Sequence, residues 1–252
     1  MRLRNWTARR SYGDGGLGAR LTVASLTIAL VMIPFMLLLV LAKLPLNPLD
    51  ASVARDLHRY ALANPDVTRL LIVWTDVFGP LTWRVAVVAA AVWLWVRGAR
   101  RVAIWATTTI AVGGLLGLAL KMIVSRARPS LPDPVALAPG EAFPSGHALT
   151  VTLGTGVLVL LILPRLPAWG RLLTWVIAWF LVVSVAYTRV ALGVHWVSDV
   201  IAGVMLGVAV LAGTVAAFET WRREQGRKPL TPPIEGVMRT TRDEPDPRHY
   251  AG

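Results

Sequence analysis

Uncharged runs long enough to cross a bilayer constrain this chain more than any other feature. Residues 21–42 carry no charged side chain, and about 20 apolar residues suffice for a helix to cross the hydrocarbon core. This run is longer than the hydrophobic part of a signal peptide, and no small-x-small cleavage site follows it. We therefore expect a retained first helix, kinked at Pro34.

Similar runs recur along the chain and predict an all-α, polytopic membrane bundle of six helices. Residues 43–69 are turn-rich and predict a loop with a short amphipathic interfacial helix, in which His58 is a solvated loop residue. The stretch 126–144 is rich in proline and predicts a loop. The expected spans are 21–42, 81–96, 102–120, 146–163, 172–188 and 195–218.

Composition and charge support this class of protein. Hydrophobic residues make up 55% of the chain and charged residues 16%, a balance typical of membrane proteins. The net charge of +12 lies mainly in the segments between apolar runs, so it indicates membrane orientation and not nucleic-acid binding. With no cysteine and four histidines, neither disulfides nor a metal cofactor is expected.

The positive-inside rule predicts that both termini are cytoplasmic, together with the basic turns at 97–101 and 165–171. We divide the chain into a basic cytoplasmic arm at 1–20, a transmembrane domain at 21–220 and a disordered cytoplasmic tail at 221–252. Three polar stretches then fall on the extracytoplasmic side, at 121–129, 144–147 and 189–199. Ionisable residues beside membrane spans suggest a functional site.

The first polar stretch contains two cations that suit a phosphate. Lys121 and Arg128 are seven positions apart, nearly two helical turns, so both point the same way if the helix continues to Pro129. Arginine offers a planar fork of donors and lysine a point charge. The alternative is a pair of cations snorkelling at a helix end.

The second stretch lies where a helix is expected to begin. Free backbone N–H groups at such a terminus attract anions, and Ser145 adds a hydroxyl donor. Gly146 lets the backbone approach a ligand closely. His147 is placed to protonate a leaving oxygen. The alternative is a capping or packing histidine.

The third stretch combines a nucleophile, a partner that orients it and a cation. His195 and Asp199 are four positions apart, adjacent on one face of a helix. The carboxylate would fix the imidazole tautomer and leave the other nitrogen free to attack. Arg189 would neutralise charge on a phosphoryl group. The alternative is a surface ion pair.

Together, the three stretches resemble the tripartite signature of the type 2 phosphatidic acid phosphatase (PAP2) superfamily, which are membrane lipid phosphate phosphatases. The matching patterns are Lys121-x6-Arg128-Pro129, Pro144-Ser145-Gly146-His147 and Arg189-x5-His195-x3-Asp199. The resemblance implies that His195 forms a phosphohistidine, Asp199 orients it and His147 is the general acid. It also implies metal-independent catalysis, and a phosphate held by Lys121, Arg128, Ser145, Gly146 and Arg189. Thr188 stands where the family usually has serine.

The resulting expectation is a multi-pass enzyme of the bacterial cell membrane with an extracytoplasmic active site. It would hydrolyse a lipid mono- or diphosphate, such as undecaprenyl pyrophosphate, phosphatidic acid or phosphatidylglycerol phosphate. Its partners would be this substrate and membrane lipids, with no nucleic acid. One alternative passes the phosphoryl group to a lipid or sugar hydroxyl, and another is a transporter or an inactive scaffold.

Overall fold

The structure, a computed structural model, describes Met32, Phe35 and residues 48–224, with side chains described up to residue 219. The basic arm, most of the first expected span and residues 225–252 of the tail lie outside the described residues. Within the described part, every regular element is helical, so the all-α prediction is confirmed. The elements are α2 (Pro48–Ala63), α3 (Pro65–Val77), α4 (Pro80–Val96), α5 (Arg100–Val124), α6 (Gly146–Ile162), the 3-10 helix η1 (Leu163–Arg165), α7 (Ala168–Ala191) and α8 (Val197–Glu224).

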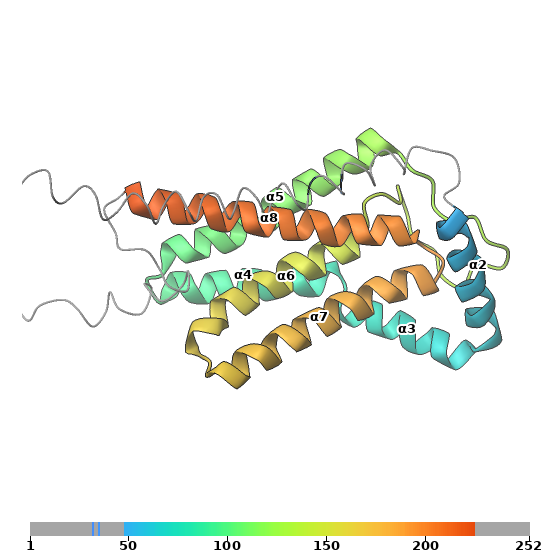
Figure 1. The fold of residues 1–252 in the computed structure, drawn as a ribbon, viewed down its shortest axis with the longest axis horizontal. Helices are drawn as coiled ribbons and strands as arrows, with labels where there is room; N and C mark the ends of the chain where they lie inside the picture. Colours follow the sequence, from blue (N-terminus) through green and yellow to red (C-terminus); the bar gives the residue numbers. More distant parts are fainter. Residues whose placement is uncertain (1–31, 33–34, 36–47, 225–252) are drawn as a thin grey trace, which may run out of the picture.

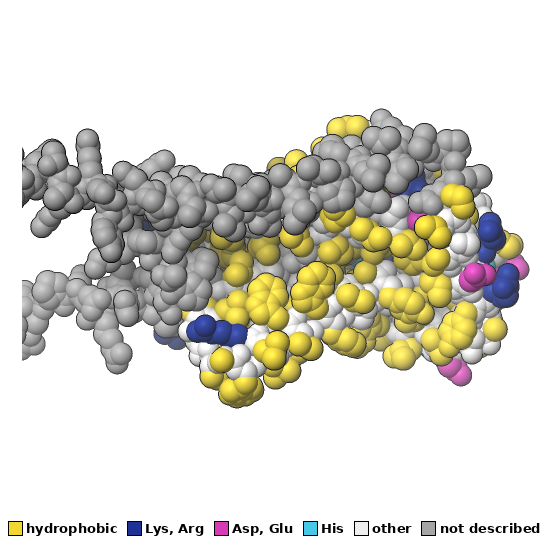
Figure 2. All heavy atoms as spheres, in the orientation of Figure 1, with side chains coloured by type: hydrophobic (Ala, Val, Ile, Leu, Met, Phe, Trp, Pro, Cys, Tyr) yellow, Lys and Arg dark blue, Asp and Glu magenta, His cyan; other side chains and the backbone are white. Residues whose placement is uncertain are grey.

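Helical segments long and apolar enough to cross a membrane occur five times in the described residues. On the face of the bundle that Figure 2 shows, hydrophobic side chains cover most of the surface of the described helices. On α7, for example, Trp179, Phe180 and Val183 are all more than half exposed. Such a surface suits lipid contact, and the chain is a multi-pass membrane protein. The segments are Pro65–Val96, Arg100–Val124, Gly146–Arg165, Ala168–Ala191 and Val197–Glu219.

The segment before the second expected span is more ordered than predicted. The prediction was a loop with one short amphipathic helix, whereas the structure has two successive helices, α2 and α3, and α3 leads into α4 through Gly79 and Pro80. Proline at a first helical position fits because its missing N–H has no partner there in any helix. The prediction of a solvated His58 is wrong: the side chain is buried, and its Nε2 lies 2.6 Å from the carbonyl oxygen of Pro132.

Helix α6 is the centre of the bundle and contacts α4, α5, α7 and α8. Gly113 and Gly117 of α5 lie directly against α6, since a Cβ at these positions would come within 2.2 and 2.7 Å of the side chains of Leu153 and Leu149. Small residues at a helix contact allow this close approach. This close contact fixes the position of α5 along α6.

The polar stretches converge at one end of the bundle. The end of α5, the start of α6, the end of α7 and the start of α8 lie there, with α2 running across them (Figure 1). Buried Ala148, Val190 and Val200 form one apolar cluster below this end and fix α6, α7 and α8 together. The basic turns 97–101 and 165–171 connect helices at the opposite end.

Candidate active site

His195 lies in the turn between α7 and α8. This turn is made possible by Gly193, whose φ of 68° is in the left-handed region that favours glycine. It is closed by the backbone N–H groups of Val194 and His195, which donate to the carbonyl of Arg189 at 3.2 and 3.1 Å. The imidazole is therefore carried by a hydrogen-bonded turn anchored to the last turn of α7.

The prediction that His195 and Asp199 share a helical face is wrong in its geometry, because α8 begins only at Val197. Asp199 instead occupies the third helical position, where its Oδ2 accepts a 2.8 Å hydrogen bond from the backbone N–H of Trp196. This is the carboxylate half of a capping box. The cap turns the carboxylate back toward the residue before the helix, which brings it near His195.

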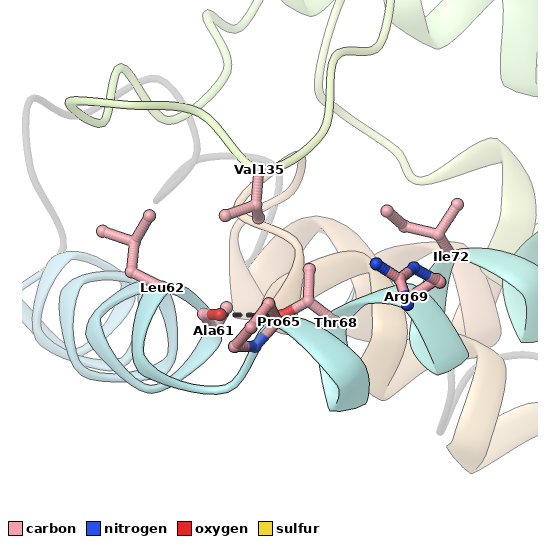
Figure 3. A pocket seen from close by; sticks show the side chains of 7 residues that line it. All are labelled: Ala61, Leu62, Pro65, Thr68, Arg69, Ile72 and Val135. Carbon is pink, nitrogen blue, oxygen red and sulfur yellow. Dashed lines mark hydrogen bonds between the residues drawn. The ribbon is translucent and has the colours of Figure 1, made fainter.

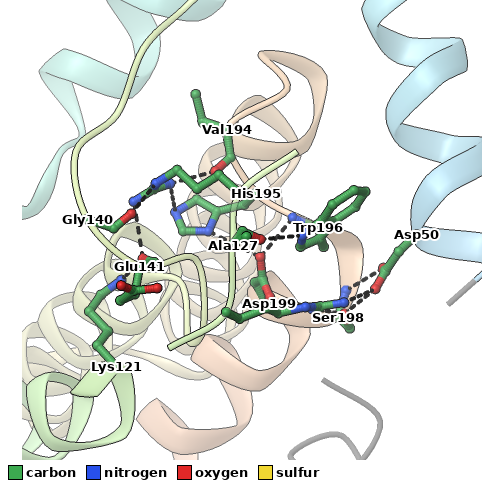
Figure 4. A network of polar contacts seen from close by, with 12 residues as sticks. Asp50, Lys121, Ala127, Gly140, Glu141, Val194, His195, Trp196, Ser198 and Asp199 are labelled. Carbon is green, nitrogen blue, oxygen red and sulfur yellow. Dashed lines mark hydrogen bonds and ion pairs between the residues drawn. The ribbon is translucent and has the colours of Figure 1, made fainter. Parts of the chain in front are cut away.

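The His195 ring lies between a carboxylate and a guanidinium (Figure 4). Its Nδ1 is 3.5 Å from Oδ2 of Asp199, which is at the outer limit of hydrogen bonding, so the attraction is mainly electrostatic. Its Nε2 is 3.2 Å from Nη1 of Arg128. Burial lowers the pKa of His195 to about 4, against the opposing influence of Asp199. The ring is therefore neutral near pH 7, as a nitrogen nucleophile requires.

The buried position of this pair rules out the surface ion pair considered from sequence. The side chains of His195 and Asp199 are 3% and 0% exposed. A carboxylate so deeply buried needs partners that stabilise its charge. His195 alone, at 3.5 Å, is a weak partner.

Arg128 does not lie on the helix that carries Lys121, because that helix does not continue to Pro129. Helix α5 ends at Val124, and Ser125 takes a left-handed conformation with φ of 48°. That cap ends the helix four residues before Pro129. Both cations nevertheless reach one point, because Lys121 Nζ and Arg128 Nη2 each donate to the carbonyl of Glu141.

All five N–H donors of Arg128 face acceptors. Nε donates to Gly140, Nη1 to Val194 and to the His195 ring, and Nη2 to Pro139 and Glu141, at distances from 2.5 to 3.3 Å. Burial lowers the pKa of Arg128, and the charges of Asp199 and Glu141 oppose this effect. A phosphate bound here must replace some of these contacts.

Ser145 is the N-cap residue of α6, which begins at Gly146 as expected. The backbone N–H of Ser145 donates to the carbonyl of Asp199 at 2.9 Å and so ties the start of α6 to that of α8. The Ser145 hydroxyl is buried and has no hydrogen-bond partner among the described residues. A helix terminus with an unused buried hydroxyl is suited to an anion. His147 follows in the first turn, where the positive charges of Arg189, Arg128 and Lys121 act on it.

Arg189 occupies the last turn of α7 and is buried. Its Nη1 donates to the hydroxyl of Thr75 on α3 at 3.2 Å, whereas its buried Nε has no partner among the described residues. The structure thus brings all the predicted site residues to one end of the bundle. Direct contacts join His195 to Arg128 and Asp199, and Lys121 and Arg128 to Glu141.

Sequence reasoning missed several polar residues beside this site. Arg126 Nη1 donates to Oδ1 of Asp199 at 2.6 Å, and its Nη2 donates to Oδ2 of Asp50 at 2.9 Å. Thr75 is the partner of Arg189. The sequence carried one signal for Arg126, its position two residues before Arg128 in the first polar stretch.

A separate hollow of about 350 Å³ lies at the corner between α2 and α3, beneath Val135 (Figure 3). Of the predicted site residues, none lines it. Thr68 at its base donates to the carbonyl of Ala61, and Arg69 pairs with Asp66. This hollow is therefore distinct from the candidate active site.

The fold and the site define a helical, multi-pass membrane protein with a cationic, histidine-centred site at one end. Residues 102–223 match the PAP2 superfamily and include all three polar stretches. This match, which spans just under half of the chain, confirms the resemblance to the PAP2 superfamily over residues 102–223.

Particular relatives are similar over this region. The chain is 34% identical over 113 residues to undecaprenyl-diphosphatase of Sulfolobus acidocaldarius. The matched region covers 43% of this chain and 51% of that protein. It is 33% identical over 96 residues to phosphatidylglycerophosphatase B of Bacillus subtilis, covering 37% and 47%. The chain therefore matches about half the length of these curated relatives.

A crystal structure shares the fold. It is described as the first transmembrane PAP2 type phosphatidylglycerolphosphate phosphatase from Bacillus subtilis. The TM-score is 0.65 at 20% identity, over 80% of this chain and 98% of that one. The agreement extends beyond residues 102–223 and supports the helical arrangement described above.

Proposed function

We propose that this protein hydrolyses the phosphate of a membrane lipid mono- or diphosphate through a phosphohistidine at His195. The observation that carries the proposal is the buried, neutral imidazole with Nδ1 toward Asp199 and Nε2 toward Arg128. The tautomer that donates from Nδ1 to the carboxylate leaves the Nε2 lone pair for attack. The relatives named as an undecaprenyl-diphosphatase and phosphatidylglycerophosphatases support a lipid phosphate as substrate.

In the first step, Nε2 of His195 bonds to phosphorus as the bond from phosphorus to the leaving oxygen breaks. His147 donates a proton to that oxygen, which departs with the lipid. Water then attacks the phosphorus, His147 takes its proton, and the P–N bond breaks to release phosphate and free His195. Arg128 turns donors from its present acceptors to the phosphate oxygens. The developing charge would be stabilised by Lys121, Arg128, Arg189, Ser145 and the N–H groups beginning at Gly146.

The proposal includes an active site on the extracytoplasmic side of a bacterial cell membrane. Its support is the placement of the basic turns 97–101 and 165–171 at the end of the bundle opposite His195. The lipid tail would remain beside the apolar helix faces while the phosphate enters the site. Among the substrates we favour a polyprenyl diphosphate, in keeping with the Sulfolobus relative.

The test measures phosphate released by the purified protein in detergent, with a chelator present. The panel contains undecaprenyl pyrophosphate, phosphatidic acid and phosphatidylglycerol phosphate. We expect turnover that orthovanadate inhibits, and a loss of roughly 100-fold or more in His147→Ala and His195→Ala. Arg171→Ala, at the opposite end, is the control and should keep full activity. Turnover by His195→Ala would contradict the mechanism.

Product analysis distinguishes hydrolysis from transfer. With a lipid or sugar alcohol present, hydrolysis yields one free phosphate for each substrate consumed. A phosphorylated acceptor without matching free phosphate would identify a phosphotransferase that uses the same residues.

A further inference from the structure

The carboxylate of Asp199 is held more tightly by Arg126 than by His195. Its Oδ1 accepts a 2.6 Å hydrogen bond from Arg126 Nη1, compared with 3.5 Å between Oδ2 and Nδ1 of His195. Arg126 is itself fixed, since its guanidinium lies over the Trp196 ring, 5.6 Å from the centroid. The Trp196 indole N–H donates to the carbonyl of Ala127 at 2.9 Å. The position of Asp199 therefore depends on a residue outside the three motifs.

Arg126 is balanced by a second buried carboxylate from another helix. Its Nη2 donates to Oδ2 of Asp50 on α2 at 2.9 Å. Figure 4 shows Asp50 beside Ser198 at the start of α8. Asp50 also accepts from the backbone N–H of Ser198 at 3.0 Å and from the Ser198 hydroxyl. The side chains of Arg126, Asp50 and Asp199 are 11%, 4% and 0% exposed. Charges this deeply buried interact strongly because little solvent screens them.

Two carboxylates, Asp50 and Asp199, and one guanidinium, Arg126, together carry a net charge of −1 next to the imidazole of His195. Without Asp50, the charge of Arg126 would cancel that of Asp199, whereas without Arg126 two carboxylates would face the ring unbalanced. Among other charged or titratable groups, Arg128 from the loop, Arg189 from α7 and His147 from α6 act on His195 directly. Behind them are Lys121 of α5, which interacts with Asp199 and Arg128, Glu141 beside both cations, and Asp76 of α3 beside Arg189.

We infer that Asp50 and Arg126 are positioning residues that act through Asp199, holding its carboxylate toward His195 and setting the net charge presented to the ring. The inference rests on the proposed function of His195 as nucleophile. Neither residue is expected to touch the substrate. Their loss should therefore reduce kcat much more than it changes KM.

The test compares pH profiles of kcat/KM for Asp50→Asn and Arg126→Gln. The acid limb reports protonation of the free enzyme's nucleophile. Asp50→Asn leaves the positive charge of Arg126 uncompensated, which disfavours the imidazolium and moves the acid limb to lower pH. Arg126→Gln removes that charge and moves the limb to higher pH. Each shift is expected to be on the order of one pH unit.

Two control variants change exposed charges on α2, the helix that carries Asp50. Asp56→Asn and Arg59→Gln remove an exposed ion pair of α2 and should leave the profile unchanged. Arg126→Lys retains the charge, so its acid limb should return to within a few tenths of a unit of the wild type even if kcat stays low. A merely structural role would lower activity without moving the limb.

The inference would be overturned if the acid limbs of the kcat/KM profiles stayed in place, or if they moved in the same direction in Asp50→Asn and Arg126→Gln. If Arg126→Gln fails to fold, as judged by gel filtration in detergent, Asp50→Asn decides alone, because it preserves the shape of the side chain. His195→Ala is measured in the same series. Its retention of activity would contradict the proposed function, which separates that failure from failure of the inference.

Discussion

Gly203 of α8 provides a test of how closely the two helices that carry the site must pack. A Cβ added there would lie 2.6 Å from the carbonyl oxygen of Ser145, 3.1 Å from Cβ of Ala148 and 3.2 Å from the backbone nitrogen of Leu149. Two of these three atoms belong to the backbone and cannot rotate away. Gly203→Ala must therefore separate the start of α6 from α8.

The size of the effect follows from these distances. Ordinary contact begins at 3.4 Å, so the Ser145 oxygen must recede by 3.4 − 2.6 = 0.8 Å. Overpacking typically costs about 1–3 kcal/mol, and the rigid contacts favour the upper end. Alanine regains about 1 kcal/mol of helix propensity. The expected net loss is about 2 kcal/mol, and a displacement near 1 Å within a reacting site lowers the rate on the order of 100-fold.

Thermal unfolding in detergent and phosphate release provide the two measurements. We expect Tm to fall by about 4–8 °C in Gly203→Ala, with a loss of activity larger than the loss of folded protein. Gly114→Ala on α5 is the control, since nothing lies within 4 Å of its added Cβ. Wild-type Tm and activity in Gly203→Ala would refute the close packing of α6 on α8.

Three further predictions concern single residues. Because burial lowers the pKa of His195 from 6.5 to about 4, the unfolded chain binds its proton first on acidification. Between these pH values the wild type should lose roughly 3 kcal/mol more unfolding free energy than His195→Gln, and parallel unfolding curves would disprove this. Thr75→Val removes the partner of buried Arg189 and should lower stability by about 1.5–3 kcal/mol, while Thr75→Ser should restore it in the same unfolding assay. Gly193→Ala, at φ of 68°, should cost about 1–2 kcal/mol and lower the Tm, and an unchanged Tm would contradict the left-handed turn.

Several features were predictable because they have local causes. Apolar runs of bilayer length can satisfy their backbone only as helices, and the predicted loop at 126–144 contains no helix in the structure. Gly146 begins α6, as the small and polar residues before it indicate. The candidate site residues were recognisable because ionisable side chains are rare beside membrane spans.

The mistaken details also have local causes that the residue pattern did not reveal. A seven-residue spacing suggested that Lys121 and Arg128 share a helix, but the left-handed Ser125 ends α5 between them. A four-residue spacing suggested that His195 and Asp199 share a helical face, but the capping contact of Asp199 starts α8 after His195. Spacing predicts direction only while the helix is continuous.

A helical membrane bundle and the chemical groups available for phosphate chemistry follow from the residue pattern alone, because hydrophobic length and residue type act locally. The contacts that hold those groups in place depend on the folded arrangement of the helices. Asp50 reaches Arg126 across 76 residues of chain, and Arg189 reaches Thr75 across 114. Contacts between residues so far apart leave no periodic pattern in the chain, since they depend on how α2 and α3 pack against the ends of α7 and α8.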